Sequence, residues 1–248
     1  MNSYDQAYQR VRSALDACLI SLVRGVPKPV LVSTPTGIAF RYKEKSPQQA
    51  LVIKCVRMLS VLTSLKVLLD HGLLLDAGSM MRISDEVGSD IMFIAGPILF
   101  AHPPEERHQR YLDELFQEEF GGADILSSRL KRNRVSRKEI RAYIARTYSD
   151  KSEVSRAVAV TELIEGVFSG FVHGAGTHTM DLFDGLDFQV PLDPKNGVLA
   201  DMRDQFSHYL QRTVQGFCFS AMAVGREDLF RTLYRLDREL FQANGEFR

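Results

Sequence analysis

The chain has 248 residues, of which 45% are hydrophobic and 25% charged, as in ordinary globular proteins that fold in water. Lys plus Arg and Asp plus Glu each number 31, so the formal net charge is zero. This balance excludes a strongly basic nucleic-acid-binding chain and an acidic tail as descriptions of the whole molecule. The length suits one large domain or two small ones, and we expect a single helical domain over residues 1–248.

The first hundred residues predict three helices and one β-hairpin. Apolar residues recur every three or four positions in the helical segments. The run Thr34-Pro35-Thr36-Gly37 separates two short apolar stretches and indicates a hairpin turn. Gly72 is expected just past the end of the second helix, and Pro97, next to Gly96, predicts a break in the third. The predicted elements are a helix over 4–24, the hairpin near 29–42, and helices over 47–71 and 73–100.

The rest of the chain predicts further helices and one long loop. Ser136 and Glu139 have the spacing of a capping box, which marks a helix start. Residues 173–198 are rich in Gly, Asp and Pro and predict a loop of a length that is often functional in helical proteins. The predicted helices cover 105–120, a short segment after 123, 136–148, 152–172, 198–224 and 226–244. The predicted fold is therefore all-α, a multi-helix bundle of seven to nine helices with one small β-hairpin.

The cysteines and the apolar runs predict the location of the protein. Cys18, Cys55 and Cys218 are far apart, show no CxxC spacing and lie among apolar residues, so buried free thiols in a reducing compartment are expected. The first residues are polar, which predicts no signal peptide. The longest uncharged apolar run, 91–101, is shorter than the roughly 20 residues that a membrane span needs. We expect a cytoplasmic protein without a membrane partner.

Several enzyme classes are not expected, because their motifs are missing. The sequence contains no GxxxxGK[ST], no GxGxxG after a predicted strand and no GxSxG. ATP hydrolysis, a Rossmann dehydrogenase and an α/β-hydrolase are therefore disfavoured, and no cofactor is predicted.

Charge is unevenly distributed between two neighbouring segments. Residues 105–124 are mainly acidic and residues 129–146 mainly basic. Two adjacent helices of opposite sign can pair with each other or be solvated separately. Alternatively, the basic helix forms a stripe that binds the phosphates of RNA or DNA. The residues of this stripe would be Arg132, Arg134, Arg137, Lys138 and Arg141.

Arg203 and His208 have the spacing that best supports a catalytic site. A histidine can move a proton near neutral pH, and an arginine can stabilise the phosphate transition state of RNA cleavage without a metal. The segment Arg203-Asp204-x3-His208 resembles the R-polar-x3-H motif of HEPN-type ribonucleases, which are helical bundles that usually dimerise across that motif. The resemblance implies metal-independent RNA cleavage by a homodimer, with Asp204 orienting Arg203. The alternative interpretation is an exposed helix with a partly buried histidine.

His173 ends a predicted helix among glycines, and His178 follows it closely. Together with Glu162 or Glu165, these histidines can serve as metal ligands or as an acid–base pair. Their spacing matches no standard metal motif, so no metal site is predicted. The alternative is a helix-capping histidine whose neighbouring glycines turn the chain.

Arg82 and Glu86 lie four residues apart in an apolar segment and predict an intrahelical ion pair, on a face that Asp90 continues. Charges among apolar residues are partly buried and must be paired, so the pair can simply buttress the bundle. Alternatively, Glu86 faces His173 in a central polar pocket to which Arg82 and His178 also belong. That arrangement gives a second hypothesis, a non-enzymatic helical module that interacts with partners or senses a ligand.

A wider resemblance rests on two of these segments. Arg82-x3-Glu86 on an early helix, followed later by Ser169-x2-Val172-His173, resembles a bacterial group of helical proteins known only as a domain of unknown function. The resemblance implies an all-α bundle and assigns no activity.

Overall fold

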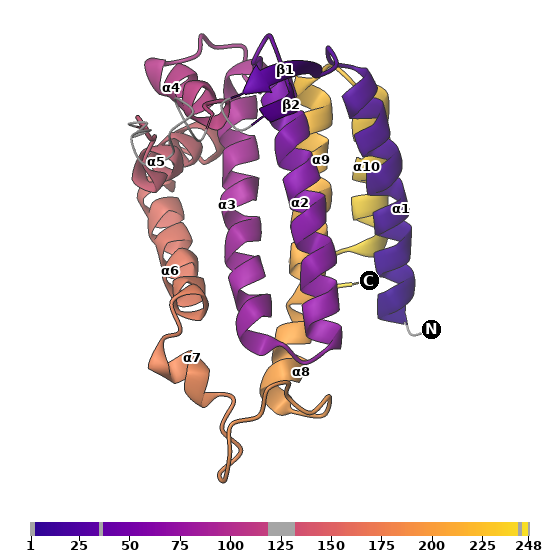
Figure 1. The fold of residues 1–248 in the computed structure, drawn as a ribbon, viewed down its shortest axis with the longest axis vertical. Coiled ribbons are helices and arrows are strands. Elements are labelled where there is room, and N and C mark those ends of the chain that lie inside the picture. Colours follow the sequence, from indigo (N-terminus) through magenta and orange to yellow (C-terminus); the bar gives the residue numbers. More distant parts are fainter. Residues whose placement is uncertain (1–2, 35–36, 119–131, 243–244, 248) are drawn as a thin grey trace.

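The structure, a computed structural model, describes residues 3–34, 37–118, 132–242 and 245–247 (Figure 1). These residues form nine helices of eight or more residues, the short helix α7 and one two-stranded sheet. The predicted all-α bundle with one small hairpin is confirmed. The elements are α1 Ser3–Arg24, β1 Val30–Thr34, β2 Gly37–Arg41, α2 Pro47–Asp70, α3 Leu74–Leu99, α4 Glu106–Leu115, α5 Arg137–Tyr148, α6 Val154–Val172, α7 Gly176–Met180, α8 Gly197–Asp204, α9 Phe206–Ala223 and α10 Glu227–Leu240.

Helices α2, α3 and α9 form the centre of the bundle. Each of the three packs against the other two. Helices α1 and α10 pack on α9 at one flank, and α5 and α6 cover α3 at the other (Figure 1). Residues 49–52, a full turn near the start of α2, are all buried, so this part of the helix is enclosed by its neighbours.

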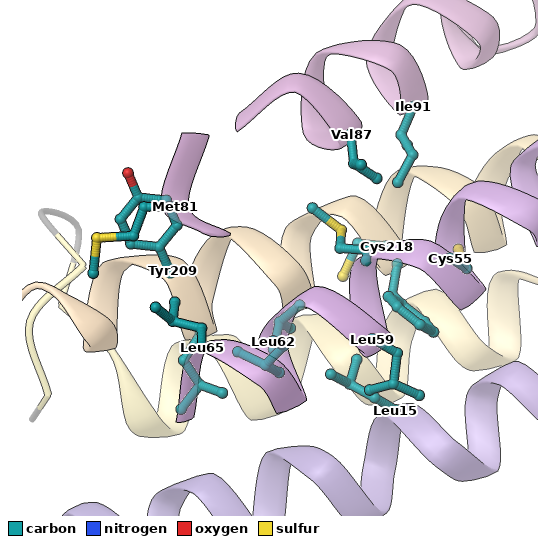
Figure 2. Packing of buried hydrophobic residues seen from close by; sticks show 14 of the residues in the cluster. Leu15, Cys55, Leu59, Leu62, Leu65, Met81, Val87, Ile91, Tyr209 and Cys218 are labelled. Carbon is teal, nitrogen blue, oxygen red and sulfur yellow. The ribbon is translucent and has the colours of Figure 1, made fainter. Parts of the chain in front are cut away.

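The core is a continuous apolar cluster that joins these helices. Figure 2 shows part of it, in which Leu59, Leu62 and Leu65 of α2 lie between Leu15 of α1 and residues of α3 such as Ile91. The three cysteines are free and buried in or beside this cluster, which confirms their predicted state. No helix within the described residues is long and apolar enough to cross a membrane.

Gly72 ends α2 in the way that its position predicted. Its φ of +72° lies in the left-handed region that favours glycine. A Cβ atom there would overlap the carbonyl oxygen of Leu192, whose N–H donates to the carbonyl of Gly72 at 3.0 Å. This hydrogen bond attaches the long loop over residues 173–198 to the C-terminal end of α2. This loop is not wholly irregular, because α7 and a bridge between Phe183 and Phe188 lie inside it.

Four predicted helix boundaries are wrong. The helix predicted over 105–120 ends as α4 at Leu115, and the helix predicted over 226–244 ends as α10 at Leu240.

Helix α3 continues for two residues past Pro97 instead of breaking there, since a proline so near the end removes only one late backbone bond. The helix predicted over 198–224 is two helices, α8 and α9, which meet at Gln205 and place Phe206 fully in the core. Arg203 and His208 therefore belong to different helices. The short helix predicted after residue 123 lies outside the described residues.

The predicted hairpin is confirmed as an antiparallel pair of five-residue strands. Leu31 faces Phe40 across the ladder, and both side chains are exposed. The turn residues 35–36 lie outside the described part of the chain.

Candidate functional site

A network of ion pairs joins α3, α5 and α6. Arg82 and Glu86 form the predicted intrahelical pair at 2.7 Å, which confirms that expectation. Arg82 Nη1 also lies 3.6 Å from Glu165 Oε1 of α6. Arg141 of α5 donates to Glu165 and, at 3.0 Å, to Glu162. The Glu165 side chain is only 8% exposed, so the two arginines compensate a charge that would otherwise be buried alone.

A second polar cluster lies between α3 and α9. Asp85 accepts a hydrogen bond from Arg212 Nη1 at 2.5 Å and another from the Tyr209 hydroxyl at 3.1 Å. The Arg212 guanidinium also lies over the Tyr209 ring, 5.0 Å from its centroid. Burial raises the pKa of the Asp85 carboxyl, and the Arg212 charge and the Tyr209 hydroxyl act against that rise. Burial and the Asp85 charge raise the pKa of Tyr209, so its hydroxyl keeps its proton and remains a donor.

The two clusters meet at an open cleft of about 270 Å³ between α3, α6 and α9, which we call the central cleft. Asp85, Glu165 and Arg212 supply its charged lining. Two glycines lie in its wall: a Cβ at Gly88 would meet only the end of Met58, at 3.5 Å, whereas a Cβ at Gly216 would lie 2.7 Å from the Met58 sulfur. The remaining lining is polar or apolar: Ser84, Ser89, Thr161 and Gln215, and Met58, Met92, Ile164 and Phe219. The arrangement can bind a small molecule through charged, polar and apolar contacts together.

Arg203 and His208 make different contacts in the described part of the chain. The Arg203 guanidinium donates to the carbonyl oxygen of Leu69 at 3.0 and 3.2 Å and to that of Pro194 at 2.8 Å. It thereby links α8 to the end of α2 and to the long loop. His208 is half-buried on α9 and packs against Gly245 near the C-terminus. Asp204 is exposed. These contacts favour the interpretation of the motif as part of an ordinary helix surface.

The two histidines of the glycine-rich segment have separate environments. His173 caps α6 and is exposed. His178 of α7 stacks on Phe171 with ring centroids 3.9 Å apart, and its Nε2 lies 3.2 Å from the Val167 carbonyl. Gly170 leaves the room for this imidazole. His178 therefore attaches α7 to α6.

The structure does not bring Glu86 and His173 together. Glu165 of α6 lies beside Arg82, and Phe171 of the same helix lies against Gly78. Residue 173 therefore lies beyond the level of Gly78, about 12 Å or more along α3 from Glu86 at 1.5 Å per residue. Glu165, and not a histidine, meets the Arg82–Glu86 pair. No group of three or more His, Cys, Asp or Glu in the described ranges is placed to hold a metal ion.

Three of the five residues of the basic stripe pair with carboxylates, Arg137 and Arg141 in largely buried positions and Arg134 on the surface, where its side chain is 69% exposed. Arg137 donates to the buried Asp90 at 2.6 Å and to the Glu86 carbonyl, and Arg134 pairs with Glu114 at 2.9 Å. Arg141 belongs to the network described above. Arg132 and Lys138 are exposed. The uneven charge of the two segments therefore mainly reflects ion pairs that link α4, α5 and the helices packed against them.

The capping box of α5 predicts a measurable pH dependence. The Ser136 N–H, the Ser136 hydroxyl and Arg110 together lower the pKa of Glu139 from the ordinary 4.5 to about 2. Because the pKa is depressed in the folded state, the stabilisation is present above pH 4.5 and is lost as pH falls towards about 2. We expect Glu139→Gln to melt below the wild type near neutral pH, and the difference to vanish across this window.

Thermal melts of both proteins at a series of pH values test this expectation, with a carbon-13 NMR titration of the Glu139 carboxyl as the matched control. A melting difference that persists unchanged to pH 2 would contradict it.

Sequence analysis missed Asp85, Tyr209 and Arg212 as members of the site. The available signal was an aspartate three residues after Arg82 in an apolar helix, and an arginine within the largely buried helix α9. Charges in such positions need partners, but the sequence does not say which helix supplies them.

Comparisons with protein-family models, with curated proteins and with solved structures found no match to this chain. The resemblances to HEPN-type ribonucleases and to the helical domain of unknown function stay predictions.

Proposed function

We propose that this protein binds a small zwitterionic molecule with an apolar side chain in the central cleft. The observation that carries the proposal is the joint presence of two largely buried carboxylates, Asp85 and Glu165, and one half-exposed guanidinium, Arg212, in the lining of one cleft.

Arg212 is suited to the anionic end of such a ligand. One of its terminal nitrogens bonds to Asp85, and its side chain is 42% exposed. A guanidinium presents several N–H donors in one plane, so it can keep this bond and still receive a ligand carboxylate.

The carboxylates are suited to the cationic end. Glu165 and Asp85 lie on opposite walls of the cleft, on α6 and α3. An ammonium group between them would meet both carboxylates, beside the arginines that already pair with them.

The size and the apolar lining define the rest of the ligand. A volume of about 270 Å³ is at the small end of ligand sites, which favours a compact metabolite over a nucleotide. Met58, Met92 and Phe219 offer a contact surface for an aliphatic or thioether side chain.

Ribonuclease activity has no comparable support. The Arg203 guanidinium is held by backbone carbonyls, and Arg137 and Arg141 of α5 are paired with carboxylates. RNA binding, a homodimer and a cytoplasmic location stay predictions.

Calorimetric titration with three related probes tests the proposal. We expect L-leucine to bind at least about tenfold more tightly than N-acetyl-L-leucine, which lacks the ammonium, or leucinol, which lacks the carboxylate. Equal binding of the three probes, or binding of none, would reject a zwitterion site.

A matched pair of variants locates the binding. Gly88 lines the central cleft, and a leucine there would fill it without changing a charge. Gly166 is exposed on α6, where an added Cβ meets nothing within 4 Å. Both changes replace a glycine with leucine in a helix interior, so the two variants are matched in type. Because only Gly88 lines the cleft, we expect Gly88→Leu to abolish L-leucine binding and Gly166→Leu to retain it.

A further inference from the structure

Two exposed apolar surfaces lie at opposite ends of the molecule. One is the β1–β2 hairpin at the top of Figure 1, and the other is the segment 182–190 of the long loop, below α7 in the same view. Neither belongs to the central cleft, so they are independent of the ligand proposed there. Exposed apolar side chains that gather in one place mark a site of contact with a partner.

The hairpin presents apolar side chains on one side of its sheet. The register pairs Leu31 with Phe40 and Ser33 with Ile38, so these four side chains share one side. Leu31, Ile38 and Phe40 are 62%, 78% and 65% exposed. The sequence has no charged residue from position 29 to position 40. We call Leu31, Ile38 and Phe40 the hairpin face.

The loop segment folds back on itself as a second small hairpin. Phe183 and Phe188 form an isolated bridge across it. Leu186 lies between them and is 87% exposed, and the side chains of Phe188 and Val190 are more than half exposed. We call Leu186, Phe188 and Val190 the loop face.

The hairpin face is bordered by basic residues. Lys28 and Lys43 are exposed on the two chain segments that lead into and out of the hairpin. Arg41 already pairs with Glu118, and Lys45 lines a cavity together with three glutamates. Lys28 and Lys43 are therefore the bases that this end of the molecule offers to a partner.

The loop face is bordered by acidic residues. Asp181, Asp184 and Asp187 are exposed in the same segment, and the sequence has no lysine or arginine from position 174 to position 194. The Asp184 carboxylate accepts the backbone N–H groups of Leu186 and Asp187, both at 2.9 Å, and so shapes the turn. Asp181 and Asp187 are the acids offered to a partner.

The two faces match each other in character and oppose each other in charge. They lie too far apart to meet within one chain, but the hairpin of one copy can meet the loop of another (Figure 1). This contact buries apolar side chains against apolar side chains and brings lysines beside aspartates. A contact between two hairpins would instead bring the lysines of both copies together, which like-charge repulsion disfavours.

We propose that this protein associates head to tail, with the hairpin face of one copy packed on the loop face of the next. Because the two contacting surfaces differ, every added copy presents a further hairpin face and a further loop face, so the contact extends into a row of copies or closes into a ring. Three apolar side chains on each side make a small contact, so we expect reversible association at high protein concentration.

Sedimentation velocity over a series of protein concentrations tests the proposal. We expect the sedimentation coefficient of the wild type to rise with concentration, and the rise to shrink in high salt, which screens the opposite charges. Ile38→Ser/Phe40→Ser removes most of the hairpin face, and Leu186→Ser/Phe188→Ser removes most of the loop face. Each double variant should associate at least about tenfold more weakly than the wild type.

A matched double variant controls for the loss of exposed apolar surface in general. Val160 and Leu163 are exposed on α6, away from both faces. We expect Val160→Ser/Leu163→Ser to associate like the wild type. All six substitutions are at exposed positions, and circular dichroism checks that each variant is folded.

Charge reversal separates a head-to-tail contact from a contact between identical faces. Lys28→Glu/Lys43→Glu makes both ends of the molecule acidic, so this variant should stay monomeric alone. Asp181→Lys/Asp187→Lys makes both ends basic and should also stay monomeric. An equimolar mixture of the two should associate, because each acidic end then meets a basic end.

Several results would overturn the proposal. A wild type that stays monomeric at every concentration shows that the faces do not bind each other. Association that survives Leu186→Ser/Phe188→Ser shows that another surface makes the contact. A mixture of the charge-reversed variants that stays monomeric shows that the opposite charges do not join the two ends. Monomeric wild type that instead binds vesicles of phosphatidylserine, and loses this binding in Ile38→Ser/Phe40→Ser, assigns the hairpin face to a membrane surface.

Discussion

Replacing Asp90 with alanine is expected to lower the free energy of unfolding by about 3–5 kcal/mol. Asp90 of α3 is 6% exposed and lies between two cations. Lys54 of α2 donates to it at 2.7 Å, and Arg137 of α5 at 2.6 Å. The alanine variant leaves both cations largely buried without their common partner, and the penalty of an unpaired buried charge exceeds the loss of an exposed ion pair.

Urea unfolding followed by circular dichroism measures this effect. Asp228→Ala is the control, because Asp228 pairs with Arg226 in a position where its side chain is 64% exposed. We expect the control to change stability far less than Asp90→Ala does, because an exposed ion pair is screened by solvent. Similar midpoints for the two variants would show that the Lys54–Asp90–Arg137 cluster does not hold α2, α3 and α5 together.

The Lys54–Asp90–Arg137 cluster also explains why the prediction of a basic stripe was reasonable but incomplete. The sequence shows that Arg137 and Arg141 lie in a basic helix, and it shows acidic residues elsewhere. It does not show that Asp90, 47 positions earlier, meets Arg137, or that Glu165 meets Arg141. A run of like charges is a property of one segment, whereas the ion pairs that these charges form depend on which helices become neighbours in the fold.

Local features of the fold were predictable because their causes lie within a few residues. The Ser136–Glu139 capping box, the hairpin around Gly37 and the left-handed Gly72 all formed where expected. The division between α8 and α9 was not predictable in this way, since the residues around Gln205 carry no glycine or proline.

The candidate site was only half predictable for the same reason. The Arg82–Glu86 pair follows from a spacing of four on one helix. Its connection to Glu165, and the meeting of Asp85 with Arg212, link segments about 80 to 130 residues apart and depend on tertiary packing. The central cleft exists because α3, α6 and α9 meet there, and no short motif encodes that meeting.

The approach of α6 to α3 gives the last prediction, a difference of about 2 kcal/mol between two Gly→Ala changes in one helix. A Cβ at Gly78 would lie within 2.8 Å of three ring atoms of Phe171, closer than carbon atoms pack. Phe171 is buried and stacked on His178, so α6 would have to shift. A Cβ at Gly88 would lie 3.5 Å from the flexible end of Met58, an ordinary contact.

The gain in helix propensity is common to both changes and cancels in the comparison, which leaves the clash alone. We expect Gly88→Ala to be about 0.5–1 kcal/mol more stable than the wild type, because alanine favours a helix interior over glycine. We expect Gly78→Ala to be about 1–2 kcal/mol less stable, since overpacking outweighs that gain. Urea unfolding of the two variants measures the difference. Equal stabilisation by the two alanine variants would mean that the Phe171 side chain moves aside at little energetic cost. The close contact of α6 with α3 would then not depend on a glycine.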